Sequence, residues 1–125
     1  MPIFASTDPG PDIYRSVGEL ENYAEGIDVQ NGEWRGYDAV GKPLALTVEG
    51  NAVRVAPGIG SAPDQLADWL RSSPLLTRRR DGGWLRQASL VELVDAFDSE
   101  ERAWREARPI RRLRRWLTRV NAKER

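Results

Sequence analysis

The chain has 125 residues with no cysteine and no histidine, and its 19 basic and 19 acidic side chains give a net charge of zero. The length predicts one domain, and the missing cysteines exclude disulfides and thiolate metal sites. Histidine is the commonest general base and metal ligand, so without it we expect a protein with no catalytic activity, no metal and no cofactor.

The first twelve residues are predicted to form a turn-rich leader, because Pro9 and Pro11 stand within its STDPGPD sequence. A short strand is expected at Ile3–Ala5, and another after the leader at Ile13–Arg15. The N-terminus has neither the basic start nor the apolar run of a signal peptide, and no stretch approaches 18 apolar residues. We therefore expect a cytoplasmic protein that does not span a membrane.

The segment SVGELENYAEGI, which begins at Ser16, predicts a helix of about ten residues. Ser16 is a suitable N-cap, with Glu19 three residues later as in a capping box. Gly26 is expected to end the helix. The apolar residues that share one face at helical spacing, and that are expected in the core, are Val17, Leu20, Tyr23, Ala24 and Ile27.

The following residues change to a period of two, which is typical of strands. Asn31–Gly32 is a strong hairpin signal, and further turns are predicted at 40–43 and at Gly50–Asn51. Residues 13–56 are therefore predicted to form a helix followed by an antiparallel β-meander with one apolar face. The residues expected on that face are Leu44, Leu46, Val48, Val53 and Val55.

The second half of the chain is predicted to be helical. A helix at 61–73 starts with Ser61 as its cap, buries Leu66, Trp69 and Leu70, and stops at Pro74. A polar turn follows at 77–84. A long helical segment spans 89–123, and Pro109 inside it predicts a kink or a new helix start. Its apolar stripe consists of Leu90, Val91, Val94, Phe97, Ala103, Ala107, Ile110, Leu113, Leu117 and Val120.

This order of elements predicts an α+β fold, with an antiparallel sheet of four to five strands packed against helices. Residues 1–125 are expected to form one domain whose long C-terminal helical segment is kinked near Pro109. Charge is divided between the halves: residues 1–65 hold ten acidic and four basic side chains, and residues 66–125 hold nine acidic and fifteen basic ones. This asymmetry indicates an interaction, either between the two halves or with another molecule.

The segment REARPIRRLRRWLTR, residues 105–119, is rich in arginine. Guanidinium groups bind phosphate, and Trp116 is of a type that stacks on bases or anchors at lipid interfaces, so nucleic acid and membrane are both alternatives. The simplest interpretation is an amphipathic helix whose arginines are solvated or pair with Glu101, Glu106 and the acidic half, and an acidic partner protein is a further alternative. The predicted basic surface is Arg108, Arg111, Arg112, Arg114, Arg115 and Arg119.

Acidic residues are concentrated between residues 19 and 38. Paired carboxylates serve in acid–base catalysis or metal sites, but no loop of metal-binding spacing and no nucleophile accompanies them. A solvated helix face with turn residues is the simplest interpretation, and a patch that meets a basic partner protein such as a nuclease is the functional one. With two aromatic anchors, the predicted partner-binding residues are Glu21, Glu25, Asp28, Glu33, Trp34, Tyr37 and Asp38.

The segment IYRSVGELENYAEGIDVQNGEWRGYDAVGKPLALTVEG, from Ile13 to Gly50, resembles a recurring pattern in small uncharacterised bacterial proteins. The pattern runs Tyr-x-Ser, an acidic helix, Ile-Asp-Val-x-x-Gly-Glu-aromatic, then Tyr-Asp-Ala-x-Gly and a strand. Some such proteins are similar to immunity proteins encoded beside secreted toxins. The resemblance implies an α+β start and a protein that neutralises a toxin by direct contact. A nucleic-acid-binding regulator that uses the arginine-rich segment is the alternative.

Overall fold

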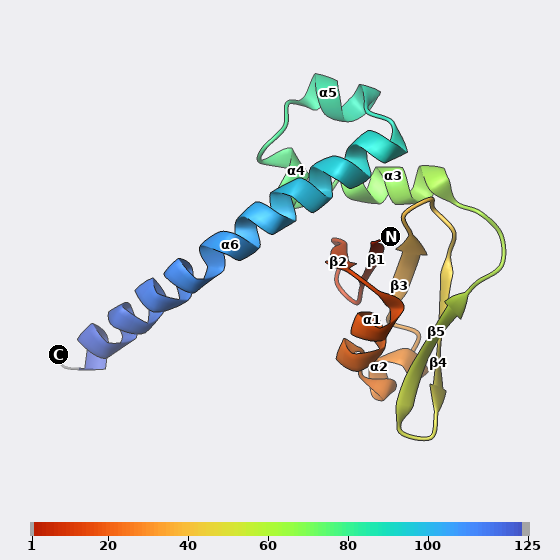
Figure 1. The fold of residues 1–125 in the computed structure, drawn as a ribbon, viewed down its shortest axis with the longest axis horizontal. Helices are drawn as coiled ribbons and strands as arrows, with labels where there is room; N and C mark the ends of the chain where they lie inside the picture. The colour runs from red at the N-terminus through yellow and green to blue at the C-terminus, as the bar shows by residue number, and fades with distance from the viewer. Residues whose placement is uncertain (1, 124–125) are drawn as a thin grey trace.

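The structure is a computed structural model that describes the backbone of residues 2–123 and the side chains of residues 2–107. Helices combine with antiparallel strands in it, which confirms the predicted α+β class. Figure 1 shows a helical layer above the strands and one long helix that leaves the rest of the molecule. No helix in the described part of the chain is long and apolar enough to cross a bilayer.

The first sheet has the N-terminal strand at its centre. β1 (Ile3–Ser6) pairs in antiparallel fashion with β2 (Asp12–Tyr14) on one side and β3 (Arg35–Asp38) on the other. Phe4 points into one hydrophobic cluster, whereas Ile3 and Ala5 point into another. Because β1 is covered on both faces, all four of its residues are buried.

The second sheet is the hairpin of β4 (Leu44–Glu49) and β5 (Ala52–Pro57). The predicted alternation is confirmed, since the residues expected on the apolar face are the more buried ones of each strand. Gly50 has φ +61° and no non-glycine residue in the described chain has positive φ, so Gly50–Asn51 fits a type II′ turn.

The prediction of one continuous sheet was wrong, because the strands form two sheets. Among the described residues, the backbone pairing between the two sheets is limited to an isolated bridge between Tyr37 and Pro43. Pro43 has no N–H to donate to a ladder, so regular pairing between β3 and β4 cannot continue through it. The hairpin is therefore free to turn away from the first sheet and cover α1 and α2 (Figure 1).

The hairpin expected at Asn31–Gly32 was also wrong, because these residues end a helix. α1 (Val17–Tyr23) is capped by Ser16 as predicted, but it ends before α2 (Gly26–Gln30) begins. Gly32, with φ +68°, donates its N–H to Val29, and Glu33 donates to Asp28. This is a Schellman motif, which uses the same positive-φ glycine that a hairpin turn requires.

Four helices build the second half: α3 (Pro63–Arg71), α4 (Pro74–Thr77), α5 (Gly82–Gln87) and α6 (Leu90–Lys123). Ser61 is not the cap of α3, because the helix starts with Pro63 after Ala62. Residues 77–84 are not only a turn, since Asp81 accepts the N–H groups of Gly83 and Trp84 and so caps α5. Two short helices thus occupy the region between the two predicted helical segments.

The main core lies between the first sheet and the helices. Phe4 meets Phe97 of α6 edge-on, with ring centroids 5.6 Å apart, and Leu66 and Leu70 of α3 are fully buried beside them. The predicted stripe of α6 is wrong at two described positions, because Val91 is 70% exposed and Ala103 is also exposed. Leu93, which was not predicted, is fully buried. The helix packs against α3 and α4 on the face that carries Leu93.

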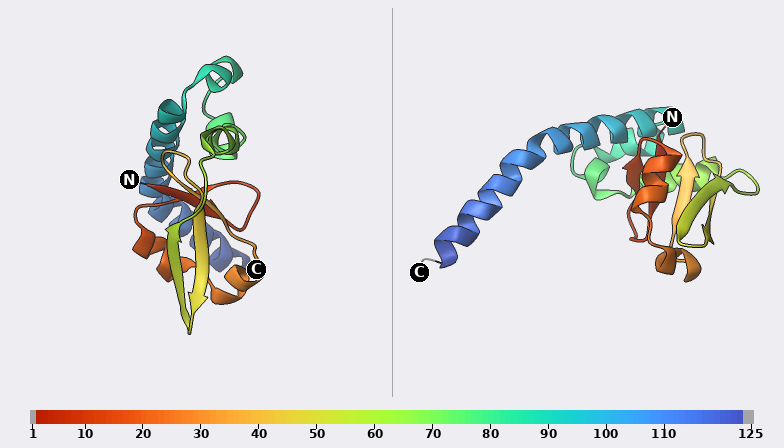
Figure 2. Two further views of the ribbon diagram at one scale, coloured as in Figure 1. Left: turned by 90° about the vertical axis from the view of Figure 1, so that its right-hand side faces the viewer. Right: turned by 60° about the horizontal axis from the view of Figure 1, so that its bottom comes forward.

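Helix α6 continues without interruption through Pro109, so no new helix starts there. Figure 2 shows that its axis changes direction along its length, and Figure 1 shows its C-terminal part extending beyond the rest of the molecule. A proline inside a helix removes one backbone hydrogen bond and crowds the preceding turn, which favours such bending. The predicted apolar stripe beyond Ala107 lies outside the residues whose side chains are described.

Candidate functional site

Three carboxylates around α2 remain on the surface. Glu25 and Glu33 are exposed and Asp28 is half-buried. A hydrogen bond between the carboxyl groups of Asp28 and Glu33 raises the pKa of Glu33, and desolvation and repulsion by Asp28 add to this effect. Neighbouring carboxylates repel one another when ionised, so a basic group of a partner would be attracted to them. We call Glu25, Asp28 and Glu33 the α2 acidic cluster.

The other two predicted acidic residues bind backbone groups of the protein itself. Glu21 accepts the Val55 N–H at 2.8 Å and so connects α1 with β5. Asp38 accepts the N–H groups of Val40 at 3.0 Å and Lys42 at 2.9 Å, which organises the turn after β3. Because Asp38 lies at the opposite end of β3 from α2, the predicted acidic residues do not share one continuous surface (Figure 1).

The two predicted aromatic anchors pack within the fold. Tyr37 is buried and donates its hydroxyl hydrogen to Gln65 at 3.2 Å, so it is not available to a partner. Trp34 is half-buried, and its ring centroid lies 6.4 Å from that of Tyr14 and 6.3 Å from that of Tyr23. Their positions follow from the strand register and the ring packing, which a local sequence pattern does not contain.

Other apolar residues, on α1 and α2, are exposed to solvent, unlike the two predicted anchors. Val17, Tyr23 and Ile27 were expected in the core, but they are 40%, 67% and 63% exposed, and only Leu20 of α1 is fully buried. The reason is a break in the helix, because Ala24 has extended backbone angles and the helical period does not continue into α2. Large exposed apolar side chains beside acidic ones are typical of a protein-binding surface.

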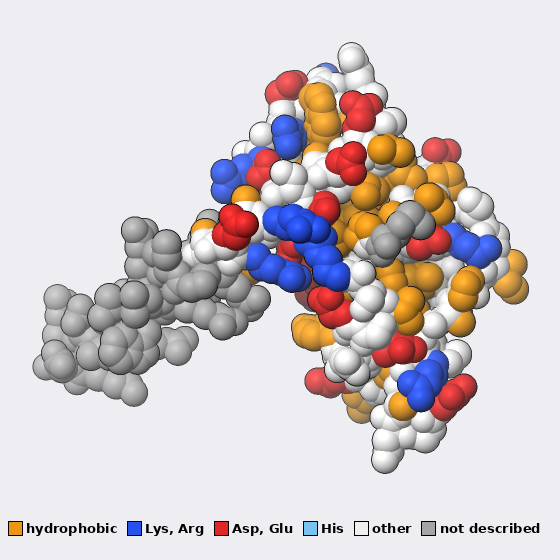
Figure 3. Space-filling model, viewed as in Figure 1, with side chains coloured by type: hydrophobic (Ala, Val, Ile, Leu, Met, Phe, Trp, Pro, Cys, Tyr) orange, Lys and Arg blue, Asp and Glu red, His pale blue; other side chains and the backbone are white. Residues whose placement is uncertain are grey.

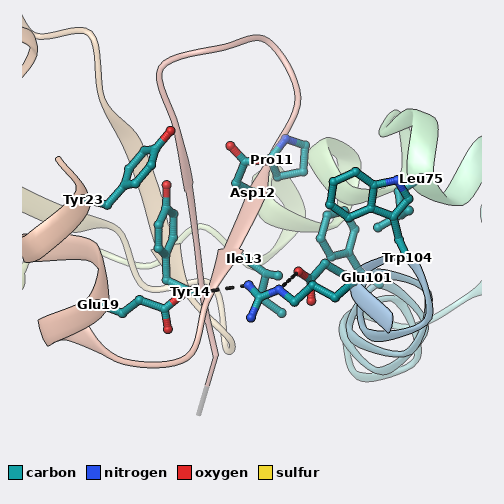
Figure 4. A pocket seen from close by; sticks show the side chains of 11 residues that line it. Pro11, Asp12, Ile13, Tyr14, Glu19, Tyr23, Leu75, Glu101 and Trp104 are labelled. Carbon is teal, nitrogen blue, oxygen red and sulfur yellow. Dashed lines mark ion pairs between the residues drawn. The ribbon is translucent and has the colours of Figure 1, made fainter. Parts of the chain in front are cut away.

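A pocket opens beside this surface, between β2 and α1 on one side and α4 and α6 on the other. Its volume is about 510 Å³. Figure 4 shows Tyr14 and Tyr23 on one wall and Trp104 with Leu75 on the opposite wall. The lining residues are Pro11, Asp12, Ile13, Tyr14, Glu19, Tyr23, Leu75, Phe97, Glu101, Trp104 and Arg105.

Asp12 lies between the aromatic walls in Figure 4. Among the residues with described side chains, none forms a hydrogen bond or ion pair with its carboxylate. Partial burial raises the pKa of Asp12, and the negative charges of Asp8 and Glu101 raise it further. Burial likewise raises the pKa of Tyr14, helped by the charge of Asp12. The pocket therefore combines aromatic walls with a carboxylate that no cationic side chain of the described residues neutralises.

We expect Asp12→Asn to leave the free energy of unfolding at pH 7 unchanged or to increase it by up to about 0.5 kcal/mol, since Asp12 keeps solvent contact. A raised pKa in the folded state means that folding penalises the ionised carboxylate, and asparagine removes this penalty. The gain should vanish as the pH falls through the carboxyl range near about 4. Urea unfolding at several pH values measures this difference, and a clear loss of stability at pH 7 would contradict it.

A network of ion pairs joins α6 to the N-terminal half beside the pocket. Arg15 binds Asp98 and also Glu101, the latter at 2.8 Å. Arg105 binds Glu101 at 2.6 Å and lies 4.0 Å from Glu19. Figure 3 shows basic and acidic side chains intermixed on this face of the molecule. Arg15 comes from the acidic half and its two partners from the basic half, so these ion pairs do not offset the division of charge between the halves. The contact of Arg105 with Glu19 joins a basic residue of the second half to an acidic residue of the first.

The predicted basic surface belongs to the C-terminal part of α6. The residues Arg108, Arg111, Arg112, Arg114, Arg115 and Arg119 lie outside those whose side chains are described. Glu101 pairs with Arg15 and Arg105, as described above. Ion pairs were predicted between the arginines of residues 105–119 and acidic residues. Among the described side chains, Arg105 forms such a pair, with Glu101.

Sequence reasoning missed the pocket because its residues come from four separate elements. Tyr23 was expected in the core, and no functional role was predicted for Trp104. Asp12 was placed in a turn-rich leader. Asp12 and Tyr23 lie far from Trp104 in the sequence, and no sequence pattern connects the three residues. Only the packing of α6 near β2 brings them into one pocket.

The described side chains contain no group of three or more acidic residues arranged to hold a metal ion. Compared with known proteins, the chain matches no family model, no curated protein and no solved structure. Two neighbouring features of the structure bear on function: the exposed acidic and apolar residues of α1 and α2, and the aromatic pocket with Asp12.

Proposed function

We propose that this protein is a non-catalytic binding protein that neutralises a basic partner protein by direct contact, as immunity proteins do for bacterial toxins. The proposal combines the resemblance of residues 13–50 to that class with the surface of α1 and α2. The observation that carries it is the position of Tyr23 and Ile27, both mostly exposed, beside the α2 acidic cluster.

Such a surface has the parts that tight and fast binding requires. Exposed aromatic and aliphatic side chains supply the area that becomes buried, and aromatic residues carry much of the energy of many interfaces. Carboxylates at the edge attract a basic partner and accelerate its association above the roughly 10⁵–10⁶ M⁻¹s⁻¹ of uncharged pairs. A partner that cuts nucleic acid would have the required positive charge.

The arginine-rich C-terminal segment supports a second candidate, a nucleic-acid-binding regulator. Its support is that α6 extends beyond the rest of the molecule, which would place this segment within reach of a duplex (Figure 1). If this function holds, affinity for DNA or RNA falls steeply with salt, and each arginine removed reduces the slope by about one. Absence of binding at about 50 mM salt would exclude it.

The test of the proposed function needs the partner itself. The neighbouring reading frame should encode a large protein with a secretion-associated N-terminus and a toxic C-terminal domain. That domain, purified, should form a complex with this protein and lose its toxicity in the complex. A domain that retains full activity in the presence of excess protein would contradict the proposal.

We expect the triple substitution Glu25→Gln, Asp28→Asn and Glu33→Gln to slow association with this domain about tenfold at low salt. The complex should dissociate at nearly the same rate, because rim charges act mainly on encounter. Stopped-flow or surface-binding kinetics at two salt concentrations measures both rates. The difference should shrink at high salt, where charges are screened.

The matched control neutralises three exposed carboxylates elsewhere, Glu49→Gln, Asp64→Asn and Asp95→Asn, and so changes net charge equally. Its association should slow by less than about threefold. Glu21 is excluded from both sets because it binds the Val55 N–H, so its substitution would disturb the fold. Equal slowing in the two triple variants would mean that net charge, and not the α2 acidic cluster, guides the partner.

A further inference from the structure

The pocket beside α1 combines two features that together select a type of ligand. Its walls are aromatic and exposed, with Tyr23 67% and Trp104 40% accessible to solvent. Between them lies Asp12, whose carboxylate has no ion pair with any side chain that the structure describes. Aromatic faces attract cations, and the carboxylate between them attracts a cation by its charge.

The other charged residues of the lining are already engaged. Arg105 lies between Glu101 and Glu19, at 2.6 and 4.0 Å, so the positive charge of Arg105 is directed to these two carboxylates. Figure 4 draws both ion pairs at the base of the pocket, away from the labelled carboxylate of Asp12. Asp12 is therefore the lining carboxylate that a cationic ligand would meet.

We propose that this pocket receives an arginine side chain of the partner protein, held by Tyr23, Trp104 and Asp12. This inference rests on the proposed function for the identity of the partner, and on the pocket alone for the chemistry of the ligand. The volume of about 510 Å³ accommodates one long side chain together with its adjacent backbone. An arginine in an aromatic pocket next to an acidic rim matches the composition of strong interface anchors.

Arginine fits the pocket better than lysine for a geometric reason. The guanidinium group is planar, so it stacks on aromatic faces while its N–H groups bind a carboxylate in two parallel hydrogen bonds. Its weaker hydration also lowers the cost of entering a pocket lined by Leu75 and Phe97. An ammonium group would bind Asp12 as a point charge and gain less from the two aromatic walls.

The ligand chemistry is tested without the partner, by titrating N-acetyl-arginine amide into the ¹⁵N-labelled protein. We expect the indole N–H signal of Trp104, assigned with Trp104→Phe, to shift and saturate at about 1–10 mM, the range of such small ligands. N-acetyl-citrulline amide has the same shape without the charge, and it should bind at least about tenfold more weakly. N-acetyl-lysine amide should bind more weakly than the arginine amide.

Two variants connect the response to the pocket. Asp12→Asn should reduce the affinity for the arginine amide to that for the citrulline amide, whereas Asp64→Asn, an exposed carboxylate outside the lining, should leave it unchanged. Circular dichroism and urea unfolding show whether each variant is folded. Equal binding of arginine and citrulline amides, unchanged binding by Asp12→Asn, or no shift at about 50 mM ligand would each overturn the proposal.

In the complex with the partner domain, the pocket and the α2 acidic cluster should act on different rates. Asp12→Asn should increase the dissociation rate about tenfold, because a desolvated charge pair is lost, while association is nearly unchanged. If the arginine amide binds saturably but no complex forms with the partner domain, only the proposed neutralising function is overturned. A complex that forms normally without any response to the arginine amide would overturn the arginine pocket alone.

Discussion

Replacing Gly41 with alanine is expected to lower the free energy of unfolding by about 3–4 kcal/mol. Gly41 has φ +87°, and a Cβ built on it would lie 2.4 Å from the Cα and 2.7 Å from the nitrogen of Pro63. Its carbonyl also accepts the Ala62 N–H at 2.8 Å. Alanine would therefore combine backbone strain with a collision against the first residue of α3.

Gly32→Ala is the matched control, because Gly32 has φ +68° but no atom within 4 Å of an added Cβ. It carries the backbone strain alone, so we expect a loss of about 1 kcal/mol. Urea unfolding followed by tryptophan fluorescence measures both variants. Similar losses in the two variants would show that the turn at residues 40–43 does not pack closely against the start of α3.

Replacing Arg15 with methionine is expected to lower the free energy of unfolding by about 2 kcal/mol at pH 7. Arg15 binds Asp98 and Glu101, which lie 83 and 86 residues further along the chain, and their side chains are 27% and 14% exposed. The variant leaves two partly buried carboxylates without this partner, and it removes a link between β2 and α6.

This loss should depend on pH. Burial alone would raise the pKa of Asp98, but hydrogen bonds and charge from Arg15 and Arg102 outweigh it and lower the pKa. A lowered pKa in the folded state contributes stability above the unfolded value, near about 3.9, and that stability is lost as the pH falls through the folded pKa. The difference between Arg15→Met and the unsubstituted protein should therefore narrow below about pH 4.

Arg102→Met provides the control, since Arg102 binds the same Asp98 at 3.1 Å but is 63% exposed. We expect it to cost less than about 0.5 kcal/mol. A double-mutant cycle of Arg15→Met with Asp98→Asn should show coupling of about 1 kcal/mol or more. Coupling near zero would mean that the network holds α6 only weakly, and that the packing of Phe97 and Leu93 suffices.

Some parts of the fold are encoded in short stretches of sequence. The alternation of residues 44–55 and the Gly50–Asn51 turn predict the β4–β5 hairpin, because both the strand period and the turn type depend on adjacent residues. The cap at Ser16 and the buried face of α3, with Leu66, Trp69 and Leu70, follow for the same reason. The α+β class follows from their order along the chain.

Other features depend on residues far apart in the chain, so only the tertiary structure decides them. Gly32 has a positive φ, as a hairpin turn would require, but Asn31 has φ −82° and the pair ends α2, because the surrounding residues pack as a helix against β4. Tyr23 and Ile27 are exposed because the chain breaks after α1. The pocket around Asp12 exists because α6 brings Trp104 to β2 across about ninety residues, a juxtaposition that no local spacing contains.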